Sequence, residues 1–231
     1  MTKYKHIFFD LDRTIWNFDK NSIEVLKDIF SKYNLREKGI PSFDKFYSTY
    51  YEINHDLWDK YRIGAITKDF LSLERFWATL RHFNIDEKET AYSMSQDYVK
   101  LSPYKTHLFP NSHEILKYLK EKYSLHLITN GFAEVQLIKI KESNLEQYFS
   151  EVIISEQTPW KKPNPAIFQY AMNQVDASAE ECIMIGDDIK ADIQGAASVG
   201  MNQIWTNLIN GKSYYKPTFE VNNLIEIKDI L

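Results

Sequence analysis

Short apolar runs followed by polar residues recur along the chain, and each is typical of a buried β-strand. They lie at residues 4–9, 125–128, 152–154, 182–185 and 202–206. In the second half of the chain, apolar positions at helical spacing predict helices between and after these runs, at residues 110–123, 134–143, 165–174, 189–199 and 222–231. Strands that alternate with helices favour a parallel sheet covered on both faces, so we expect an α/β fold.

The stretch between the first two apolar runs has a different pattern. Apolar residues recur at helical spacing through residues 17–101, and no convincing strand pattern appears there. Turn residues such as Gly39, Pro41 and Gly64 divide it into successive helices. We therefore expect one α/β domain, residues 1–16 and 102–231, with an inserted helical domain at residues 17–101.

Composition and charge narrow the class of protein. The chain has 231 residues, 44% of them hydrophobic, and a formal net charge of −4, as in ordinary globular proteins. It has no basic stripe for nucleic acid, and its apolar runs are too short for a membrane span or a signal peptide. Its one cysteine, Cys182, is interpreted as a buried thiol. We expect a cytoplasmic monomer or weak dimer that binds neither nucleic-acid polymers nor membranes.

Four groups of polar residues stand where predicted strands end. They are Asp10 and Asp12, then Thr129-Asn130-Gly131, then Lys162, then Asp187, Asp188 and Asp192. Because the carboxyl ends of parallel strands meet at one edge of a sheet, where ligands bind, we expect these groups to converge. Each group alone is more often an ordinary turn or helix cap. Their common placement at strand ends is what favours a site.

Such a site would gather up to five carboxylates, whose like charges repel strongly at short range. A divalent cation would relieve that repulsion, and all-oxygen ligands favour Mg²⁺. The charge of Lys162 and the neutral donors of Thr129 and Asn130 suit a phosphoryl group, while a carboxylate nucleophile can form an aspartyl phosphate. The pattern predicts phosphoryl chemistry on a small phosphorylated metabolite.

Taken together, the four groups resemble the four motifs of the haloacid dehalogenase superfamily. The matching segments are residues 8–14, Thr129-Asn130-Gly131, Lys162-Pro163 and residues 186–192. The helical insertion after the first motif resembles that superfamily's helical cap. The resemblance implies a Rossmann-like core, a cap at residues 17–101 and Mg²⁺-dependent phosphoryl transfer.

The resemblance also implies a role for each residue. Asp10 would attack phosphorus, and Asp12 would protonate the leaving oxygen and then activate water. Mg²⁺ would be held by Asp10, Asp187 and the backbone carbonyl of Asp12, with Asp188 and Asp192 just outside these ligands. Thr129 and Asn130 would bind the phosphoryl oxygens, and Lys162 would neutralise both the nucleophile and the phosphate.

The chain departs from the superfamily pattern at a few positions. Arg13 stands where glycine is commonest, and Trp160 lies near the lysine motif, where a small residue is common. Of the adjacent Lys161 and Lys162, we assign the role to Lys162 because it precedes Pro163. These departures leave the chemistry intact but leave loop geometry and substrate contacts open.

A narrower resemblance concerns the substrate. Residues 12–18, 54–58 and 217–224 resemble the pyrimidine 5′-nucleotidases that act on nonstandard nucleotides, which implies a nucleoside 5′-monophosphate. A sugar phosphatase, a phosphoglycolate phosphatase and a phosphomutase stay open as alternatives. A dehalogenase has no need for Asp12 as acid or for Mg²⁺. A binding module without activity is disfavoured by the intact aspartates and lysine.

One helical face of the insertion carries candidate substrate contacts. Spacings of 4, 3, 4 and 3 residues join Tyr47, Tyr51, Asn54, Trp58 and Tyr61. This face either packs the core of the insertion or stacks on a substrate base, with Asn54 bonding the base edge. We take Asn54, Trp58 and, on the next helix, Arg75 as candidates, although an arginine there is usually a solvated surface charge.

Overall fold

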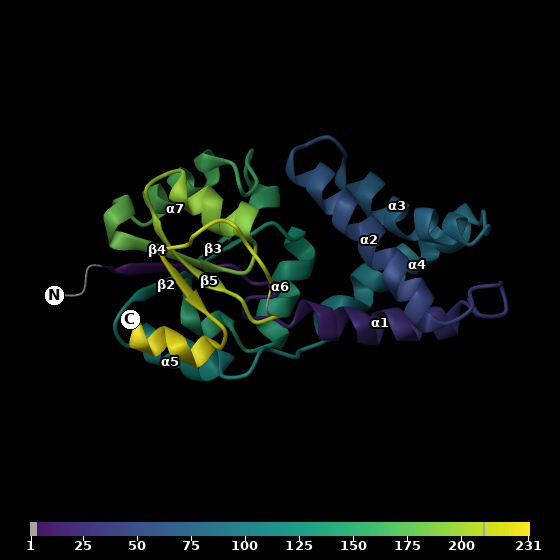
Figure 1. The fold of residues 1–231 in the computed structure, drawn as a ribbon, viewed down its shortest axis with the longest axis horizontal. Coiled ribbons are helices and arrows are strands. Elements are labelled where there is room, and N and C mark those ends of the chain that lie inside the picture. The colour runs from purple at the N-terminus through teal and green to yellow at the C-terminus, as the bar shows by residue number, and fades with distance from the viewer. Residues whose placement is uncertain (1–3, 210) are drawn as a thin grey trace. The chain divides into compact units, whose positions relative to one another are not determined.

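The parallel sheet expected from the sequence is present, with one strand more than expected (Figure 1). Its strands are β1 (His6–Phe9), β2 (Ser124–Thr129), β3 (Phe149–Ile154), β4 (Cys182–Gly186), β5 (Asn202–Thr206) and β6 (Phe219–Val221). They run in the order β3-β2-β1-β4-β5-β6, and all neighbours pair in parallel. The computed structural model describes residues 4–209 and 211–231, and it confirms the α/β fold class.

The contacts between residues divide the chain into two units. One unit, here called the core unit, consists of Met1–Phe18 and Thr106–Leu231 and contains the sheet. The other, the helical unit, consists of Asp19–Lys105. That residues 17–101 act as a cap domain stays a prediction.

The sheet of the core unit is covered on both faces. Its helices are α5 (Ser112–Lys120), α6 (Ala133–Glu142), α7 (Pro165–Gln174) and the short α8 (Gly195–Ala197). Ile7 and Phe9 of β1 pack in one apolar cluster with residues of α5 and α6, and Phe8 packs in another with residues of α7. Figure 1 shows α5 and α7 on opposite sides of the sheet. Burial on both faces explains why β1 and β4 are almost wholly apolar runs.

The strand order places a topological switch point at β1. Its neighbours are β2 on one side and β4 on the other, and the chain reaches them in opposite directions from β1. In open parallel sheets, ligands bind in the crevice outside the carboxyl ends of the strands at such a point. The residues that follow β1, β2 and β4 therefore lie at the edge where such a fold binds ligands.

Two predicted helices at the end of the chain were wrong in form. Residues 222–231 do not form an α-helix: β6 precedes them, and Leu224–Asp229 is a 3₁₀ helix whose first turn is capped by Asn223. Residues 189–199 begin as a π-helix, Ile189–Gln194, before α8. Its wider turn lets the carboxylate of Asp192 reach back to the N–H of Asp188. The helix predicted at 110–123 is shorter, as α5.

Helices alone form the helical unit. They are α1 (Phe18–Lys32), which starts at the junction, α2 (Phe43–Arg62), α3 (Lys68–His82) and α4 (Lys88–Leu101), followed by a 3₁₀ turn at Ser102–Tyr104. Ser42 and Thr67 cap α2 and α3 by accepting backbone N–H bonds, as N-caps do. Arg75 is only 2% exposed, so its description as a solvated surface charge was wrong. No helix in the described ranges combines the length and the apolar character that a membrane span requires.

His6 on β1 and His126 on β2 form a contacting pair of histidines on neighbouring strands of the core unit. His126 on β2 is 2% exposed, and its ring centroid lies 4.9 Å from that of Phe8. Its Nε2 is 3.1 Å from Nδ1 of His6. Burial, together with the nearby His6, lowers the pKa of His126 from 6.5 to about 4.

The pKa shift of His126 predicts a pH-dependent stability that a variant removes. Between pH 6.5 and about 4 the unfolded chain binds the His126 proton and the folded chain does not, so folding is progressively penalised as the pH falls. The free energy of unfolding of wild type minus that of His126→Phe should therefore become more negative as the pH falls through this window. Urea unfolding of both proteins checks this, since groups common to both cancel. A difference that does not change with pH would contradict it.

Candidate active site

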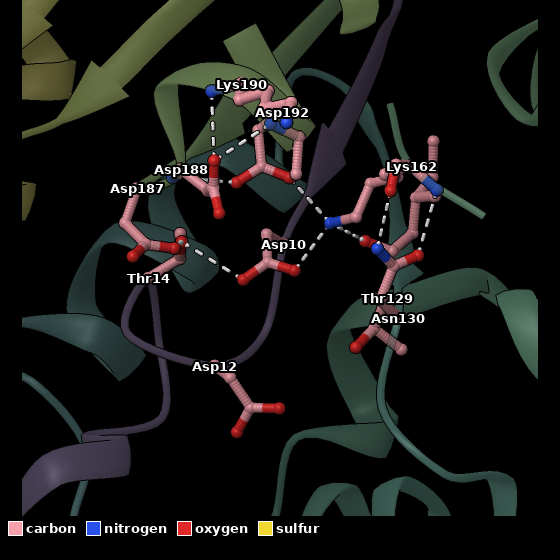
Figure 2. A network of polar contacts seen from close by, with 12 residues as sticks. Asp10, Asp12, Thr14, Thr129, Asn130, Lys162, Asp187, Asp188, Lys190 and Asp192 are labelled. Carbon is pink, nitrogen blue, oxygen red and sulfur yellow. Dashed lines mark hydrogen bonds and ion pairs between the residues drawn. The ribbon is translucent and has the colours of Figure 1, made fainter. Parts of the chain in front are cut away.

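The four predicted groups of polar residues do converge at the carboxyl edge of the sheet (Figure 2). Asp10 directly follows β1, and its N–H donates to the carbonyl of Ile185 in β4 at 2.8 Å. Thr129 is the last residue of β2, and Asp187 follows β4. Short apolar strands that end at the same level thus deliver these side chains to one edge of the sheet.

Lys162 is the buried cation of this site. Its ammonium lies 2.6 Å from Oδ1 of Asp10, 2.6 Å from Oδ1 of Asp192 and 2.7 Å from the carbonyl oxygen of Ile128. An ammonium has three N–H donors, so these bonds use all of them. Burial acts to lower the pKa of Lys162, but the charges of Asp10 and Asp192 outweigh it and raise that pKa. Lys162 is therefore held in its charged form.

Asn130 holds the backbone of Lys162 in place. Its Nδ2 donates to the carbonyl of Lys162 at 2.8 Å, and its Oδ1 accepts from the Lys162 N–H at 2.9 Å. The amide thus pairs with both backbone groups of one residue, much as a neighbouring strand would. That Asn130 binds a phosphoryl oxygen stays a prediction.

Asp10 is one of three carboxylates that lie close together. Ligand atoms of Asp10, Asp187 and Asp192 lie within 4.8 Å of one another. Burial raises the pKa of Asp10 to about 7; Lys162 opposes that rise, while Asp192 and Asp12 add to it. Burial and the charges of Asp10 and Asp192 hold the pKa of Asp187 well above its usual range. One lysine does not neutralise this cluster, and its oxygen-only donor set fits a hard divalent cation.

Asp188 and Asp192 shape the loop after β4. Oδ1 of Asp188 accepts the backbone N–H groups of Lys190 and Ala191, each at 2.9 Å, and so caps the π-helix. Oδ2 of Asp192 accepts the Asp188 N–H at 3.0 Å. A Cβ at Gly186 would collide with the Asp192 carboxylate, so glycine is required there.

Asp12 lies outside this carboxylate cluster. Figure 2 shows its side chain pointing away from the ion pairs of Lys162. Its two oxygens contact Lys139 and Gln136 of α6. The sequence analysis missed both residues, because polar positions three apart on a helix usually form a solvated face. It also assigned no role to Thr14, whose hydroxyl lies 3.4 Å from both Asp10 and Asp187.

The departures from the superfamily pattern have a local explanation. Arg13 adopts φ 62°, the left-handed region that favours glycine, and its N–H donates to the carbonyl of Trp16. Its guanidinium lies 4.9 Å from the centroid of Phe18. The hydroxyl of Thr158 accepts the N–H of Trp160 and donates to its carbonyl, which fixes the turn ahead of Lys161 and Lys162.

The helical unit holds the candidate substrate contacts. The face shared by Tyr47, Tyr51, Asn54, Trp58 and Tyr61 is not uniformly packed, because Asn54 and Tyr61 are buried while Tyr51 is 41% exposed. Oδ1 of Asn54 is buried without a hydrogen-bond donor among the described residues. The Arg75 guanidinium lies 4.7 Å from the centroid of Tyr98, and its Nε has no acceptor in the same part of the chain.

Comparisons with known proteins agree with these features. A family model described as haloacid dehalogenase-like hydrolase matches residues 7–206. Pyrimidine 5′-nucleotidase PynA from Streptococcus pneumoniae is 31% identical over 232 residues, covering 99% of this chain and 95% of that protein. Pyrimidine 5′-nucleotidase YjjG from Escherichia coli is 27% identical, covering 99% and 98%. The magnesium-bound structure of YfnB from Bacillus subtilis, named as a hydrolase of the haloacid dehalogenase (HAD) type, has a TM-score of 0.91 at 27% identity, covering 99% of both chains. The resemblance found in the sequence is confirmed.

The buried position of Lys162 predicts a large effect on stability. Lys162→Met keeps the length of the side chain but leaves Asp10 and Asp192 without their cation, so we expect a loss of about 3–5 kcal/mol in the free energy of unfolding. Asp10→Asn in the same chain should recover part of it, because one of the unpaired charges is gone. Urea unfolding in the presence of a chelator measures both.

A surface lysine provides the matched control for Lys162. Lys228 pairs with Glu114 on the outside of the core unit, so Lys228→Met should change stability by no more than about 0.5 kcal/mol. If the two lysine variants lost equal stability, or if Asp10→Asn gave no recovery, Lys162 would not have the role described.

Proposed function

The chain belongs to the haloacid dehalogenase-like hydrolases, and on that premise we propose that it is a phosphatase of small metabolites with Asp10 as its nucleophile. The observation that carries the proposal is the placement of Asp10. It lies at the switch point of the sheet, paired with Lys162 and facing Asp187. A second carboxylate, Asp12, stands two residues further on with its own partners.

The proposed reaction has two displacements at phosphorus. In the first, an oxygen of Asp10 bonds to phosphorus while the bond to the leaving oxygen breaks, and Asp12 gives that oxygen a proton. In the second, Asp12 takes a proton from water as the water oxygen attacks phosphorus. The bond between Asp10 and phosphorus then breaks, which releases phosphate and restores the Asp10 carboxylate. Thr129 donates to a phosphoryl oxygen, and Lys162 keeps the Asp10 charge compensated between turnovers.

Mg²⁺ is the cofactor that this donor set fits. We assign its binding to the carboxylates of Asp10 and Asp187 and to the backbone carbonyl of Asp12. Asp192 is left outside, because its oxygens are bound by Lys162 and by the Asp188 N–H. When bound, the cation would neutralise the cluster and stabilise charge on the phosphoryl group.

The proposed substrate class is a pyrimidine nucleoside 5′-monophosphate. The names of PynA and YjjG, two relatives similar to nearly the whole chain, support it. Within the helical unit, the unpartnered Oδ1 of Asn54 and Nε of Arg75 support it as well. Buried polar groups without partners are costly, and a base edge offers both donors and acceptors. Trp58 would add stacking area.

Activity should depend on Asp10 and on Mg²⁺. Asp10→Asn keeps the shape of the side chain but removes the nucleophilic charge, so phosphate release should fall by several orders of magnitude. Chelation of divalent ions should abolish wild-type release, and added Mg²⁺ should restore it. Ca²⁺ should restore it poorly, because it prefers more ligands at longer distances. Near wild-type release by folded Asp10→Asn, or full activity after chelation, would contradict the proposal.

Base recognition should depend on Asn54 and Arg75. Asn54→Ala and Arg75→Met should lower kcat/KM for a pyrimidine monophosphate while sparing a small phosphate ester without a base. Stacking in single-strand binders contributes roughly 1–3 kcal/mol per base and tolerates base identity, so discrimination should follow Asn54 rather than the rings. Glu52→Ala, exposed on the same helix, is the matched control. Equal losses on both substrates together with a lower Tm would assign these residues to packing alone.

A further inference from the structure

Two polar side chains of α6 are buried beside the site without a part in the reaction proposed above. Gln136 is 0% and Lys139 3% exposed. Burying an amide or an ammonium is costly unless the group is hydrogen-bonded. The two residues stand three apart and so share one face of the helix. Both reach the carboxylate of Asp12.

Each oxygen of Asp12 has its own donor. Lys139 Nζ lies 2.6 Å from Oδ1, and Gln136 Nε2 lies 2.9 Å from Oδ2. The Lys139 ammonium also lies 4.1 Å from the ring centroid of Trp16, so packing restricts its direction. With both oxygens bound from one helix, the Asp12 carboxylate is fixed against rotation.

This orientation suits an acid that serves the leaving group. Asp12 points away from Asp10 (Figure 2). In an in-line displacement the attacking and leaving oxygens lie on opposite sides of phosphorus. An acid that protonates the leaving oxygen must therefore stand away from the nucleophile by the width of the phosphoryl group.

Gln136 also fixes the hydrogen-bonding role of Thr129. Gln136 Nε2 lies 2.6 Å from Thr129 Oγ1, and the Gly131 N–H donates to the same oxygen at 3.3 Å. With both lone pairs accepting, the hydroxyl adds a further bond only as a donor, as a phosphoryl oxygen requires. The two N–H groups of the Gln136 amide thus point to Thr129 Oγ1 and to Asp12 Oδ2, and each Asp12 oxygen keeps a second position, where Asp12 carries the proton that it transfers. A Cβ at Gly131 would collide with Gln136, so glycine there admits the amide.

We propose that Gln136 and Lys139 are positioning residues of the phosphatase reaction, an inference that rests on the function proposed above. Lys139 acts through Asp12 by holding its carboxylate where the leaving oxygen departs. Gln136 acts through Asp12 and Thr129 together, and so links the acid for the leaving group to the donor for the phosphoryl group.

Lys139→Gln tests the first link with two substrates. Nitrophenyl phosphate has a good leaving group, and a nucleoside 5′-monophosphate has a poor one that needs a proton. General acid catalysis typically contributes 10²–10⁴-fold, so losing the held orientation should lower kcat on the nucleotide roughly 10–100-fold. The loss on nitrophenyl phosphate should be much smaller, and KM should change little. Lys139→Arg keeps the charge and should recover most of the rate, while Lys141→Gln, exposed on the same helix, should change neither rate.

Double variants decide whether each residue acts through its partner. In an Asp12→Asn background, Lys139→Gln should lower kcat no further, because the carboxylate it holds is gone. Gln136→Leu should raise KM for both substrates, because the Thr129 hydroxyl loses its fixed direction. In a Thr129→Val background, adding Gln136→Leu should raise KM no further. Should Lys139→Gln fail to fold, Gln136→Leu tests the same link, because it frees one Asp12 oxygen and should lower kcat on the nucleotide more than on nitrophenyl phosphate, with no such difference in an Asp12→Asn background.

Several results would overturn the positioning role. Equal losses on the two substrates, a further loss in the Asp12→Asn background, or a faster nucleotide reaction after Lys139→Gln would each do so. A wild-type protein that releases phosphate from neither substrate would remove the proposed function itself, and the positioning role with it. The wild-type rate therefore tells the two failures apart.

Discussion

The geometry of the site depends on the ion pairs that the Lys162 ammonium makes with Asp10 and Asp192. Asp10 and Asp192 are both buried at the carboxyl edge of the sheet, where their charges need a partner. Lys162 binds both at 2.6 Å and gives its third N–H to the Ile128 carbonyl. Breaking such a buried pair leaves an uncompensated charge, so the loops that carry these groups are tied to one another.

The supporting structure follows from that constraint. The amide of Asn130 holds the Lys162 backbone, so the loop after β2 supports the loop after β3. The π-helix after β4 turns Asp192 back toward the lysine, and Gly186 leaves room for its carboxylate. Asp12 pairs with a separate cation, Lys139, in the last turn of α6. Two carboxylates two residues apart thus have different partners, which suits the nucleophile and acid roles proposed for them.

The sequence predicted the strands and the polar residues that directly follow them, because both are visible in short stretches of the chain. Strands such as β1 and β4 are apolar runs that end in aspartates, so their edge and its chemistry were visible together. β6 was missed because its three residues, Phe219–Val221, are too few to show a period. The π-helix was predicted as an ordinary helix, because its wider turn goes with the hydrogen bond from the Asp188 N–H to Asp192, a contact that the sequence pattern does not show. The neighbouring sequence does not show that Lys139, Gln136 and Arg75 are buried, because elements distant in the chain cover them.

The direct test of the central claim is to trap the phosphoryl group on the protein. The Asp12→Asn variant, supplied with Mg²⁺ and nitrophenyl phosphate, should form the aspartyl phosphate but break it down slowly, because no base activates water. Acid quenching followed by borohydride converts a phosphorylated aspartate into homoserine, which peptide mass spectrometry locates. The account predicts homoserine at position 10 and at no other aspartate. Homoserine at another position, or full phosphate release with none formed at position 10, would contradict it.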